Sequence, residues 1–509
     1  MSFLIKPLTL ISKTLLHIIS PDGGIPLSVN AKRIPRFYGS IAVPSDLGNK
    51  NRCFSHPYLA SEGVNGMHGD SYNTDAYPFS SVLGNTPLVR SKALNVFGGM
   101  LATIMFDSKG RIIAVSGNIA GFRLLLMDPE SLEILAETRL PQRASTKQFF
   151  KTLDFKKIST DTSGGAYFHL LKGDRPIIGN SQNVIQIFRI DETGNSPAWI
   201  IEKEWDVSSY LPEGSYLQDV IPDYHGNKWF SARCGQVGFI DEADAVHVMT
   251  IEGEEIHNAL AVGEDGVFLN TDYAQYKFGI DERGSLQIIW RTEYDRGTSA
   301  KPGSILQGSG TTPTLLDVQK RDGTTSRLVA LADNADDRIH IVIIDRDTGS
   351  IISQVPLFDH WHSTTENSII AYDRSFIIEN NYSPNGAAFL KKDPKGYPGV
   401  ARVDVNEEVT RAYLVWESRE ASPTTVPKLS IKNGLIYLYT REMNKDIPQK
   451  TVAWYLTAID FKTGKTVFKI LTGTGIRWNN SYAPITLGPN NTAYIGVFNG
   501  VVSVSDRKE

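Results

Sequence analysis

Four short strand-like runs, separated by turn residues, recur about every 50 residues along most of this chain. The clearest unit covers residues 256–294, which read IHNALAVGED, GVFLNTD, AQYKFGIDE and LQIIWRTEY. The turn sequences E-D-G and D-E-R-G separate these runs, and Gly, Asp and Asn are typical of tight turns. This pattern indicates an antiparallel all-β repeat rather than alternating strands and helices.

Similar units follow one another from residue 97 to the end of the chain. A four-stranded unit repeated in this way is typical of a β-propeller, in which each unit forms one blade of a ring. The sequence therefore predicts an all-β fold, with an eight-bladed β-propeller over residues 87–509. A seven-bladed ring and a pair of β-sandwich domains are the alternatives.

The last unit is incomplete, because APITLGPN, TAYIGVFN and GVVSVSD supply only three strands before the chain stops. A ring left open at this point would expose an unpaired strand edge. The run PLVRSKALNV, residues 87–96, directly precedes the first full blade and has no unit of its own. We therefore predict that this N-terminal strand completes the last blade and closes the ring.

The first 86 residues lack the strand repeat. Residues 1–20 have apolar side chains at helical spacing with lysines on the other side, which predicts an amphipathic helix. This helix could pack on the main domain, act as a signal peptide, or make a peripheral membrane contact through residues 4–19. Residues 21–86 are rich in Gly, Asn, Asp and Tyr, and we expect an irregular arm laid over one mouth of the ring's channel.

Composition narrows the class of partner and compartment. The net charge is -4, so no basic surface for nucleic acid is expected. Two cysteines, Cys53 and Cys234, are too few for a disulfide framework. The body of the chain is expected to be soluble, in the cytoplasm or at a membrane surface in preference to secreted.

Polar residues occur at matching positions of several blades. In a propeller, the start of each inner strand and the loop between the second and third strands face one mouth of the channel. The catalytic candidates in these positions are His257, Glu366, Glu379, Lys428 and Arg441. The ligand-binding candidates, two of them from the arm, are His68, Asp70, Asn258, Thr311, Thr312, Asn367, Asn380 and Asn480.

These residue types predict a polar pocket for a small polar or anionic molecule, because shielded charges are costly unless they are paired. His257 could act as a general base, Glu366 or Glu379 as its partner carboxylate, and Lys428 and Arg441 could hold an anion. An acid and base enzyme is the favoured hypothesis, with its reaction open. The structural alternative is a ring of polar groups that only pair with one another, and a non-catalytic interaction scaffold is a further alternative.

A metal is a second way to use the same mouth. Asp333, Asn334 and Glu379 carry hard oxygen ligands of the kind that calcium prefers. No specific metal motif accompanies them, so the cofactor is open and calcium is one option. A quinone-dependent or metal-dependent oxidoreductase is therefore kept as an alternative function.

The segment LTAIDFKTGKTVFK, residues 456–469, resembles the repeat of quinoprotein dehydrogenase-like (PQQ-like) propellers, in which a D-x-x-T-G turn joins two strands. VIIDRDTGSI at 342–351 is similar. The combination of HGDSYNTD, GSGTTPT and ENNY also resembles an uncharacterised group of bacterial propellers. The resemblance implies the propeller fold. It makes pyrroloquinoline quinone doubtful, because the adjacent cysteines and the tryptophan motif that recurs in blades of that family's alcohol dehydrogenases are not evident here.

Overall fold

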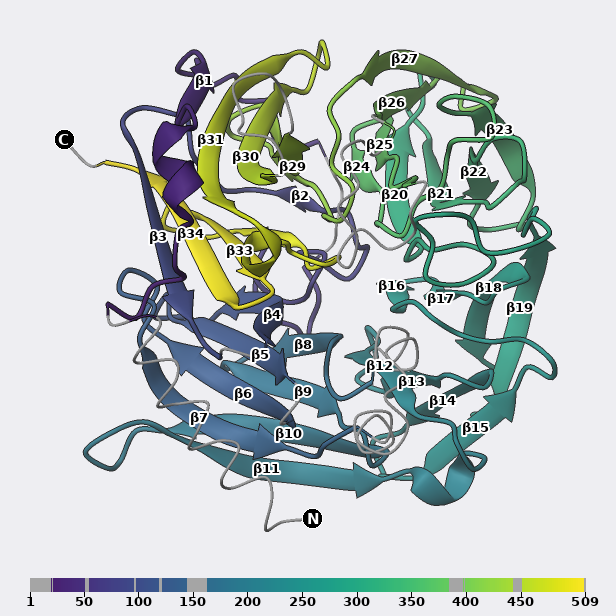
Figure 1. Ribbon diagram of the computed structural model, residues 1–509. Coiled ribbons are helices and arrows are strands. Elements are labelled where there is room, and N and C mark those ends of the chain that lie inside the picture. Colours follow the sequence, from purple (N-terminus) through teal and green to yellow (C-terminus); the bar gives the residue numbers. More distant parts are fainter. Residues whose placement is uncertain are drawn as a thin grey trace.

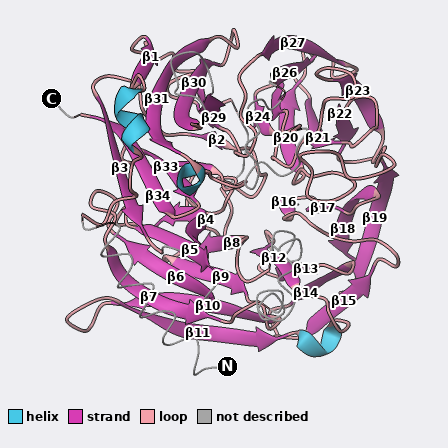
Figure 2. Cartoon of the chain, in the orientation of Figure 1, coloured by secondary structure: helices cyan, strands magenta, loops and turns pink. Residues whose placement is uncertain are grey.

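The computed structural model describes residues 20, 22–50, 55–95, 98–118, 121–143, 163–383, 397, 399–442 and 451–507. Its strands form eight sheets arranged as the blades of a ring (Figure 1), and the four strands of each blade are antiparallel. Three short 3-10 turns, η1 (Val29–Arg33), η2 (Ser208–Tyr210) and η3 (Ile476–Trp478), are the helical elements of this part of the chain (Figure 2). The eight-bladed all-β propeller predicted from the repeat is confirmed.

The blades follow the chain in order. The first four blades are β4 (Gly98–Phe106), β5 (Ile112–Asn118), β6 (Gly121–Met127) and β7 (Ile134–Leu140); β8 (Phe168–Leu171), β9 (Arg175–Gly179), β10 (Val184–Asp191) and β11 (Ala198–Asp206); β12 (Leu217–Pro222), β13 (Lys228–Ala232), β14 (Gln236–Ile240) and β15 (Val246–Thr250); and β16 (Ala261–Gly263), β17 (Gly266–Asn270), β18 (Ala274–Ile280) and β19 (Leu286–Glu293).

The next three blades contain β20 (Thr314–Gln319), β21 (Thr325–Ala332), β22 (His340–Asp345) and β23 (Ile351–Pro356); β24 (Ile370–Tyr372), β25 (Ser375–Glu379), β26 (Val400–Val405) and β27 (Ala412–Ser418); and β28 (Lys428–Ser430), β29 (Leu435–Glu442), β30 (Ala453–Asp460) and β31 (Thr466–Thr474). The eighth blade contains β32 (Ile485–Leu487), β33 (Ala493–Val497), β34 (Gly500–Asp506) and β3 (Pro87–Ala93).

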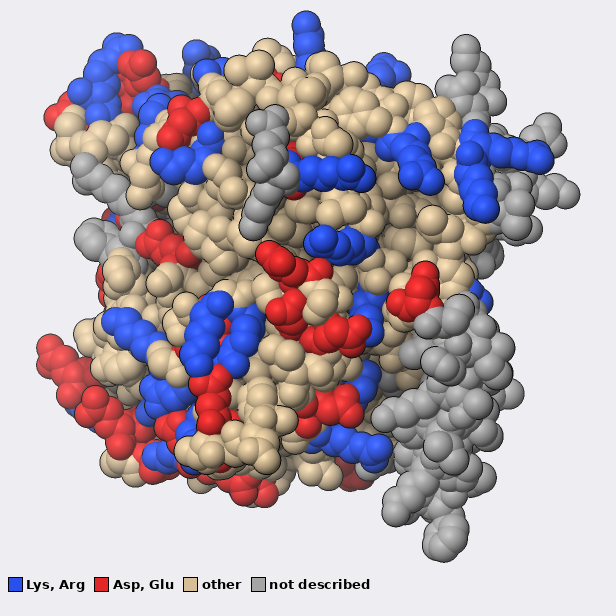
Figure 3. Space-filling view, turned by 90° about the vertical axis from the view of Figure 1, so that its left-hand side faces the viewer, with Lys and Arg blue, Asp and Glu red and all other residues tan. Residues whose placement is uncertain are grey.

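The first strand of each blade lies nearest the axis and the fourth lies at the rim (Figure 1). Inner strands such as β12 are buried at every position, whereas rim strands such as β11 are exposed at most positions. The apolar runs of the sequence therefore supply the inner strands, and the mixed runs supply the rim. Figure 3 shows that cationic and anionic side chains are intermingled over the side of the molecule that it draws.

Ring closure uses the two ends of the repeat region. Strand β3 pairs antiparallel with β34 from Pro87↔Asp506 to Ala93↔Gly500. This contact gives the last blade its fourth strand and leaves no blade of the ring with three strands. The predicted closure by an N-terminal strand is confirmed.

The second blade differs from the sequence interpretation. The sequence pattern predicts FKKISTD as the inner strand of this blade, followed by GAYFHLL as its second strand, but FKKISTD lies outside the described residues. The inner strand is β8, and the second strand is β9, whose sequence RPIIG was not recognised as a strand. A five-residue run with Pro near its start and Gly at its end carries few strand-favouring residues, so the expected register was shifted by one strand.

Two tryptophans join neighbouring blades. Trp290 of β19 donates its indole N–H to the Arg346 carbonyl at 3.0 Å, and Trp416 of β27 does the same to Phe461 at 3.1 Å. Each indole packs on the glycine of a D-x-x-T-G turn, Gly349 (φ 73°) for Trp290 and Gly464 for Trp416. These contacts occur at two blade interfaces, whereas the tryptophan motif expected to be missing is one that recurs in most blades. The pattern escaped notice because each tryptophan and its turn belong to different blades.

The described part of the arm adds a strand to each side of the seventh blade. Strand β1 (Phe37–Gly39) pairs with β31 at the rim, and β2 (Ala76–Tyr77) pairs in parallel with β28 at the axis. The strand order in this six-stranded sheet is therefore β1-β31-β30-β29-β28-β2. The arm therefore pairs with this blade both at the rim of the ring and at its axis.

Residues 71–77, here called the channel segment, run along the inner strands of four successive blades. Their carbonyls accept hydrogen bonds from the N–H groups of Val262, Leu315, Ala371 and Leu429 at 2.7–2.9 Å. These N–H groups lie on the axis-facing edge of their strands, where they would otherwise lack a backbone partner. The arm therefore enters the channel, where its backbone forms hydrogen bonds with the inner strands that make the channel wall.

Residues 1–19 lie outside the described residues, and they include nearly all of the amphipathic helix predicted for residues 1–20. The expected membrane contact through residues 4–19 falls on the same stretch, and Cys53 also lies outside the described residues. Of the helical turns that the structure does describe, none has the length and apolar character of a bilayer-crossing helix.

Candidate functional site

The mouth at which the inner strands begin, here called the upper mouth, gathers most of the predicted residues. Glu366 and Asn367 precede β24, Lys428 begins β28, and Asn480 precedes β32. Glu366 and Asn480 are 114 positions apart in the chain, and the inner strands of the blades to which these residues belong are arranged around one axis (Figure 1). The channel segment lies below them, between the inner strands.

A buried ion pair joins the channel segment to the seventh blade. The Lys428 ammonium pairs with the Asp75 carboxylate, and both side chains are fully buried. The ammonium also donates to the Met67 carbonyl at 2.9 Å. Burial lowers the pKa of Lys428, and the charge of Asp75 opposes this effect.

His68 completes this group. Its Nδ1 lies 3.1 Å from both carboxylate oxygens of Asp75, and its Nε2 lies 3.4 Å from the Ser368 hydroxyl. The His68 side chain is 3% exposed. One carboxylate therefore holds two side chains that the sequence placed in the site, Lys428 and His68, while Asp75 itself was not among the predicted site residues.

Asp70 lies on the same arm loop. It accepts hydrogen bonds from the Thr74 N–H at 3.1 Å and from the Thr74 hydroxyl. Burial, with a smaller contribution from the charges of Glu62 and Asp75, raises the pKa of Asp70 to about 7. Its oxygens cap the turn that leads into the channel segment, so its visible role is structural.

Glu379 is fully buried at the end of β25. Its Oε2 accepts a hydrogen bond from the Asn367 amide at 2.7 Å, and that amide also donates to the Thr425 carbonyl. Burial raises the pKa of Glu379 well above its usual range. Burial therefore favours the protonated, neutral form of the Glu379 carboxyl group.

Glu366 occupies a different setting. Its Oε1 accepts a hydrogen bond from the Ile305 N–H at 2.8 Å, in the loop of residues 302–310 that joins the fourth and fifth blades. Burial raises the pKa of Glu366 to about 8, and the backbone N–H groups of Ile305 and Leu306 oppose this shift. The residue as a whole nevertheless remains partly exposed.

Two tyrosines lie near Glu366. Tyr482 donates its hydroxyl to the Gly303 carbonyl at 2.8 Å and so connects the eighth blade to the 302–310 loop. Burial raises the pKa of both Tyr482 and Tyr167, and the charge of Glu366 contributes to each shift. Both residues as a whole are partly exposed.

Arg441 brings a positive charge to this group, since its charge acts on Tyr482 in the opposite direction to that of Glu366. The Arg441 side chain is buried at the upper mouth, in β29. Tyr482 has φ 65° and its neighbour Ser481 has φ 42°. Two consecutive non-glycine residues in the left-handed region are costly, and such strain is often found at functional sites.

Several predicted ligand-binding residues hold loops together. The Asn258 amide donates to the Ser309 carbonyl at 3.1 Å, the Thr311 hydroxyl accepts from the Ala332 N–H at 3.0 Å, and the Thr312 N–H donates to the Ser368 hydroxyl at 3.3 Å. Asn380 accepts from the Thr364 and Tyr382 N–H groups at 3.2 and 3.0 Å. Asn480 donates to the Ala483 carbonyl at 2.8 Å and bonds to both Thr424 and Thr425. These contacts give the five residues a structural role.

His257 lies apart from the Glu366 group. Its Nε2 is 3.5 Å from the Glu255 carboxylate, and burial together with the charge of Arg233 lowers the pKa of His257 to about 3. An imidazole with this pKa is neutral and weakly basic at pH 7. The environment of His257 therefore opposes the predicted role of general base.

The three residues proposed for calcium do not share a site. Asp333 binds His340 through its carboxylate, at 2.8 Å from Nδ1, and the Asn334 amide donates to the Arg296 and Ser299 carbonyls. Glu379 is engaged with Asn367 in the next blade. Within the described ranges, no group of three or more His, Cys, Asp or Glu side chains is arranged to hold a metal ion.

Three residues of the upper mouth and channel were not among the predicted site residues. Asp75 was one of several polar residues of the arm, and only the structure selects it as the partner of Lys428. Tyr482 stands at the expected register, before β32, so its position was a usable signal. Tyr167 stands at the matching position before β8, and the misassigned second blade hid it.

Comparison with known proteins gives no family. No family model matches the chain. An uncharacterized protein of Archaeoglobus fulgidus is 26% identical over 331 residues, which cover 57% of this chain. The matched region spans only 62% of that relative's length.

Solved structures similar to this chain include a streptogramin B lyase (10% identity, 82% of this chain and 97% of that chain, TM-score 0.38). The Dos1 propeller (10% identity, 84% and 97%, TM-score 0.39) and U3-55K (9% identity, 77% and 99%, TM-score 0.40) are others. We draw no functional argument from likenesses this weak.

Proposed function

We propose that this protein binds a small polar or anionic molecule at the upper mouth of its channel, where Glu366 donates a proton or a hydrogen bond to it. The observation that supports the proposal is the combination at Glu366 of partial exposure with a pKa of about 8. A carboxyl group with this pKa is mostly protonated at pH 7 and can still lose its proton at modest cost. A general acid needs a pKa near the working pH.

Neighbouring groups suit such a ligand. The phenols of Tyr167 and Tyr482 can donate or accept hydrogen bonds, and Tyr167 has no hydrogen-bond partner among the described residues. Arg441 provides a cation within reach of the same phenol of Tyr482. A ligand with hydroxyl, carbonyl or carboxylate groups would satisfy this set, because each member can bond an oxygen atom.

The buried groups below Glu366 support the site rather than act in it. Lys428, Asp75 and His68 bond to one another and are almost fully shielded from solvent. They hold the channel segment in place, and this segment forms the floor beneath the partly exposed residues. The fixed floor limits the water that can surround a ligand, which strengthens polar contacts to it.

The matched test compares Glu366→Gln and Glu366→Leu with Glu282→Gln, a variant in the exposed β18–β19 turn. Thermal shifts are measured for each protein with a panel of sugars, dicarboxylates and phosphate esters. We expect at least one compound to raise the melting temperature of the wild type and of Glu282→Gln but not that of Glu366→Leu. The same compound should keep part of its effect on Glu366→Gln, because glutamine preserves the shape of the side chain and a hydrogen-bond donor.

Direct titration gives an independent check. Difference infrared spectra of the wild type minus Glu366→Gln should show a carboxyl group that ionises near pH 8. Ionisation near 4.5, the ordinary value for this side chain, or ligand effects that Glu366→Leu leaves intact, would contradict the proposal.

We also propose a relationship to quinoprotein dehydrogenase-like propellers at the level of the repeat. The two D-x-x-T-G turns, each with a tryptophan of the preceding blade packed on its glycine, support this view.

A further inference from the structure

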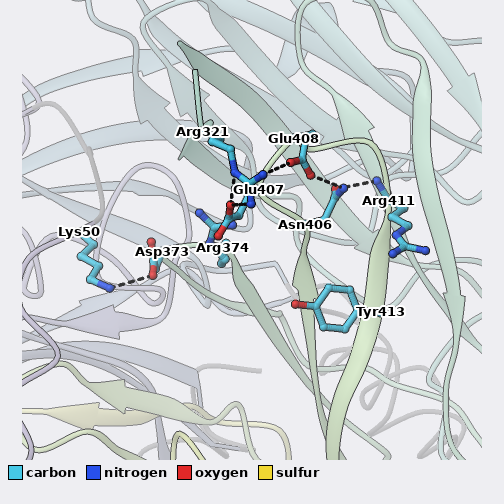
Figure 4. A pocket seen from close by; sticks show the side chains of 9 residues that line it. All are labelled: Lys50, Arg321, Asp373, Arg374, Asn406, Glu407, Glu408, Arg411 and Tyr413. Atoms are coloured by element: carbon cyan, nitrogen blue, oxygen red, sulfur yellow. Dashed lines mark hydrogen bonds and ion pairs between the residues drawn. The ribbon is translucent and has the colours of Figure 1, made fainter. Parts of the chain in front are cut away.

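A second polar feature lies on the opposite face of the ring, where the inner strands end. It is a cleft of about 840 Å³ between the turns of the fifth and sixth blades, with one wall from the arm. The residues that line it are Lys50, Arg321, Asp373, Arg374, Asn406, Glu407, Glu408, Arg411 and Tyr413 (Figure 4).

The charges of the cleft are unequally paired. Lys50 binds Asp373 at 3.1 Å, and Arg321 binds both Glu407 and Glu408 (Figure 4). Every carboxylate of the cleft therefore already faces a cation. Arg374 and Arg411 are different, because neither guanidinium has an ion-pair or hydrogen-bond partner among the described residues, and Figure 4 draws no interaction from either group.

The backbone keeps the two arginines in place. Arg374 lies in the β24–β25 turn and its carbonyl accepts from the Val405 N–H at 2.9 Å. The N–H of Arg411 donates to the Asn406 side chain at 3.1 Å, which closes the β26–β27 turn. Both arginines thus extend from short turns anchored on the rigid sixth blade, so little backbone order would be lost on binding.

The arm shapes the opposite wall. Tyr372 donates its hydroxyl to the Leu47 and Gly48 carbonyls at 2.7 and 2.6 Å, which holds the arm against the blade up to Lys50. A smaller cleft of about 290 Å³ continues past Lys50 and Asp373. Tyr413, 48% exposed, adds an aromatic surface, and its hydroxyl is directed toward the side of Arg374.

We propose that this cleft is a binding site for a small anion with phosphate or carboxylate groups, held by Arg374 and Arg411. Guanidinium groups bind these anions through paired hydrogen bonds. The lining has four cationic and three anionic side chains, so the cleft carries one excess positive charge, and Arg374 and Arg411 are the cations whose guanidinium groups can bond to an added anion. The Tyr413 hydroxyl provides a further donor. This site is independent of the function proposed for Glu366, since it lies on the other face and shares no residue with it.

The test uses isothermal titration of the full chain with inorganic pyrophosphate and with citrate at low ionic strength, so that the two anion classes are compared. Variants Arg374→Gln and Arg411→Gln are matched with Arg283→Gln, an exposed arginine in the β18–β19 turn. We expect saturable binding of at least one probe, weakened about threefold by each cleft variant, unchanged in Arg283→Gln, and weaker at higher salt.

A gain of binding provides a further test. Glu408→Gln removes a competing carboxylate and should tighten binding of the same probe, whereas Glu282→Gln should not. The absence of saturable binding to the wild type, or an equal loss in Arg283→Gln and the cleft variants, would overturn the proposal. All of these side chains are on surface turns, so loss of binding is separable from loss of folding by a thermal melt.

Discussion

Two lysines of the seventh blade, Lys428 and Lys432, each form an ion pair with an aspartate of the arm. Lys428 meets Asp75 inside the channel, where both side chains are fully buried. The Lys432 ammonium lies 2.9 Å from the Asp46 carboxylate on the solvent-exposed surface, where the two side chains are 53% and 49% exposed. The residue types, the blade and the arm are the same, and only access to solvent differs.

This difference decides what each pair can do. Water screens the outer pair and can solvate either partner alone, so losing one partner costs little. The channel excludes water, so a charge left without its partner there is strongly unfavourable. The same reasoning separates Glu366, with a pKa of about 8, from carboxylates on the outer faces.

The largest expected effect is from Lys428→Met. It leaves the Asp75 carboxylate buried without its cation, and we expect a loss of about 3–5 kcal/mol in the free energy of unfolding. Urea unfolding followed by tryptophan fluorescence measures this loss. Lys432→Met is the matched control and should cause no measurable change; equal losses in the two variants would show that burial does not distinguish the pairs.

A smaller effect is expected from pH. The folded pKa of Glu366, about 8, lies above its ordinary value of 4.5, so the folded state holds a proton that the unfolded chain releases. Its contribution to stability is complete below pH 4.5 and is lost as pH rises toward 8. Wild type minus Glu366→Gln should therefore show a stability difference that falls by about 1–3 kcal/mol over this range. A flat difference would place Glu366 with the solvent-exposed carboxylates.

The smallest effect concerns the cleft. Asp373→Asn removes the partner of Lys50 and should change the free energy of unfolding by less than about 1 kcal/mol. Salt should reduce even this change, because exposed charges are screened over about 10 Å at 0.1 M. Thermal melts of the variant and wild type at low and high salt measure it. A loss as large as that of Lys428→Met would mean that this face behaves like the channel.

Much of the fold followed from the sequence pattern. Turn residues at regular spacing predicted eight blades, and the missing strand of the last unit predicted the closure by β3. The errors occurred where local signals were weak: RPIIG is too short to read as a strand, and the contacts of Trp290 and Trp416 join separate blades.

The candidate site was predicted less completely. The repeat alone predicted that Glu366, Lys428 and Arg441 lie at one mouth of the channel. In the structure Glu366 precedes the inner strand β24 and Lys428 begins the inner strand β28, whereas Arg441 lies in the second strand β29. Asp75, Tyr167 and Tyr482 were not selected, and His257 was given a role that its surroundings oppose. The repeat determines the position of a residue in its blade. The protonation state and the bonding partners of its side chain depend on neighbours from other blades and from the arm.

By itself, the sequence determined the strand repeat and the number of blades. It also determined that the first and last strands of the repeat region must pair to close the ring. Only the tertiary structure decided that the arm enters the channel and that Asp75 pairs with Lys428. It also decided that the guanidinium groups of Arg374 and Arg411 have no ion-pair or hydrogen-bond partner among the residues that the structure describes. The reason is that strand formation depends on residues close together in the chain, whereas solvation and pairing of charges depend on groups that approach one another only after the ring has closed.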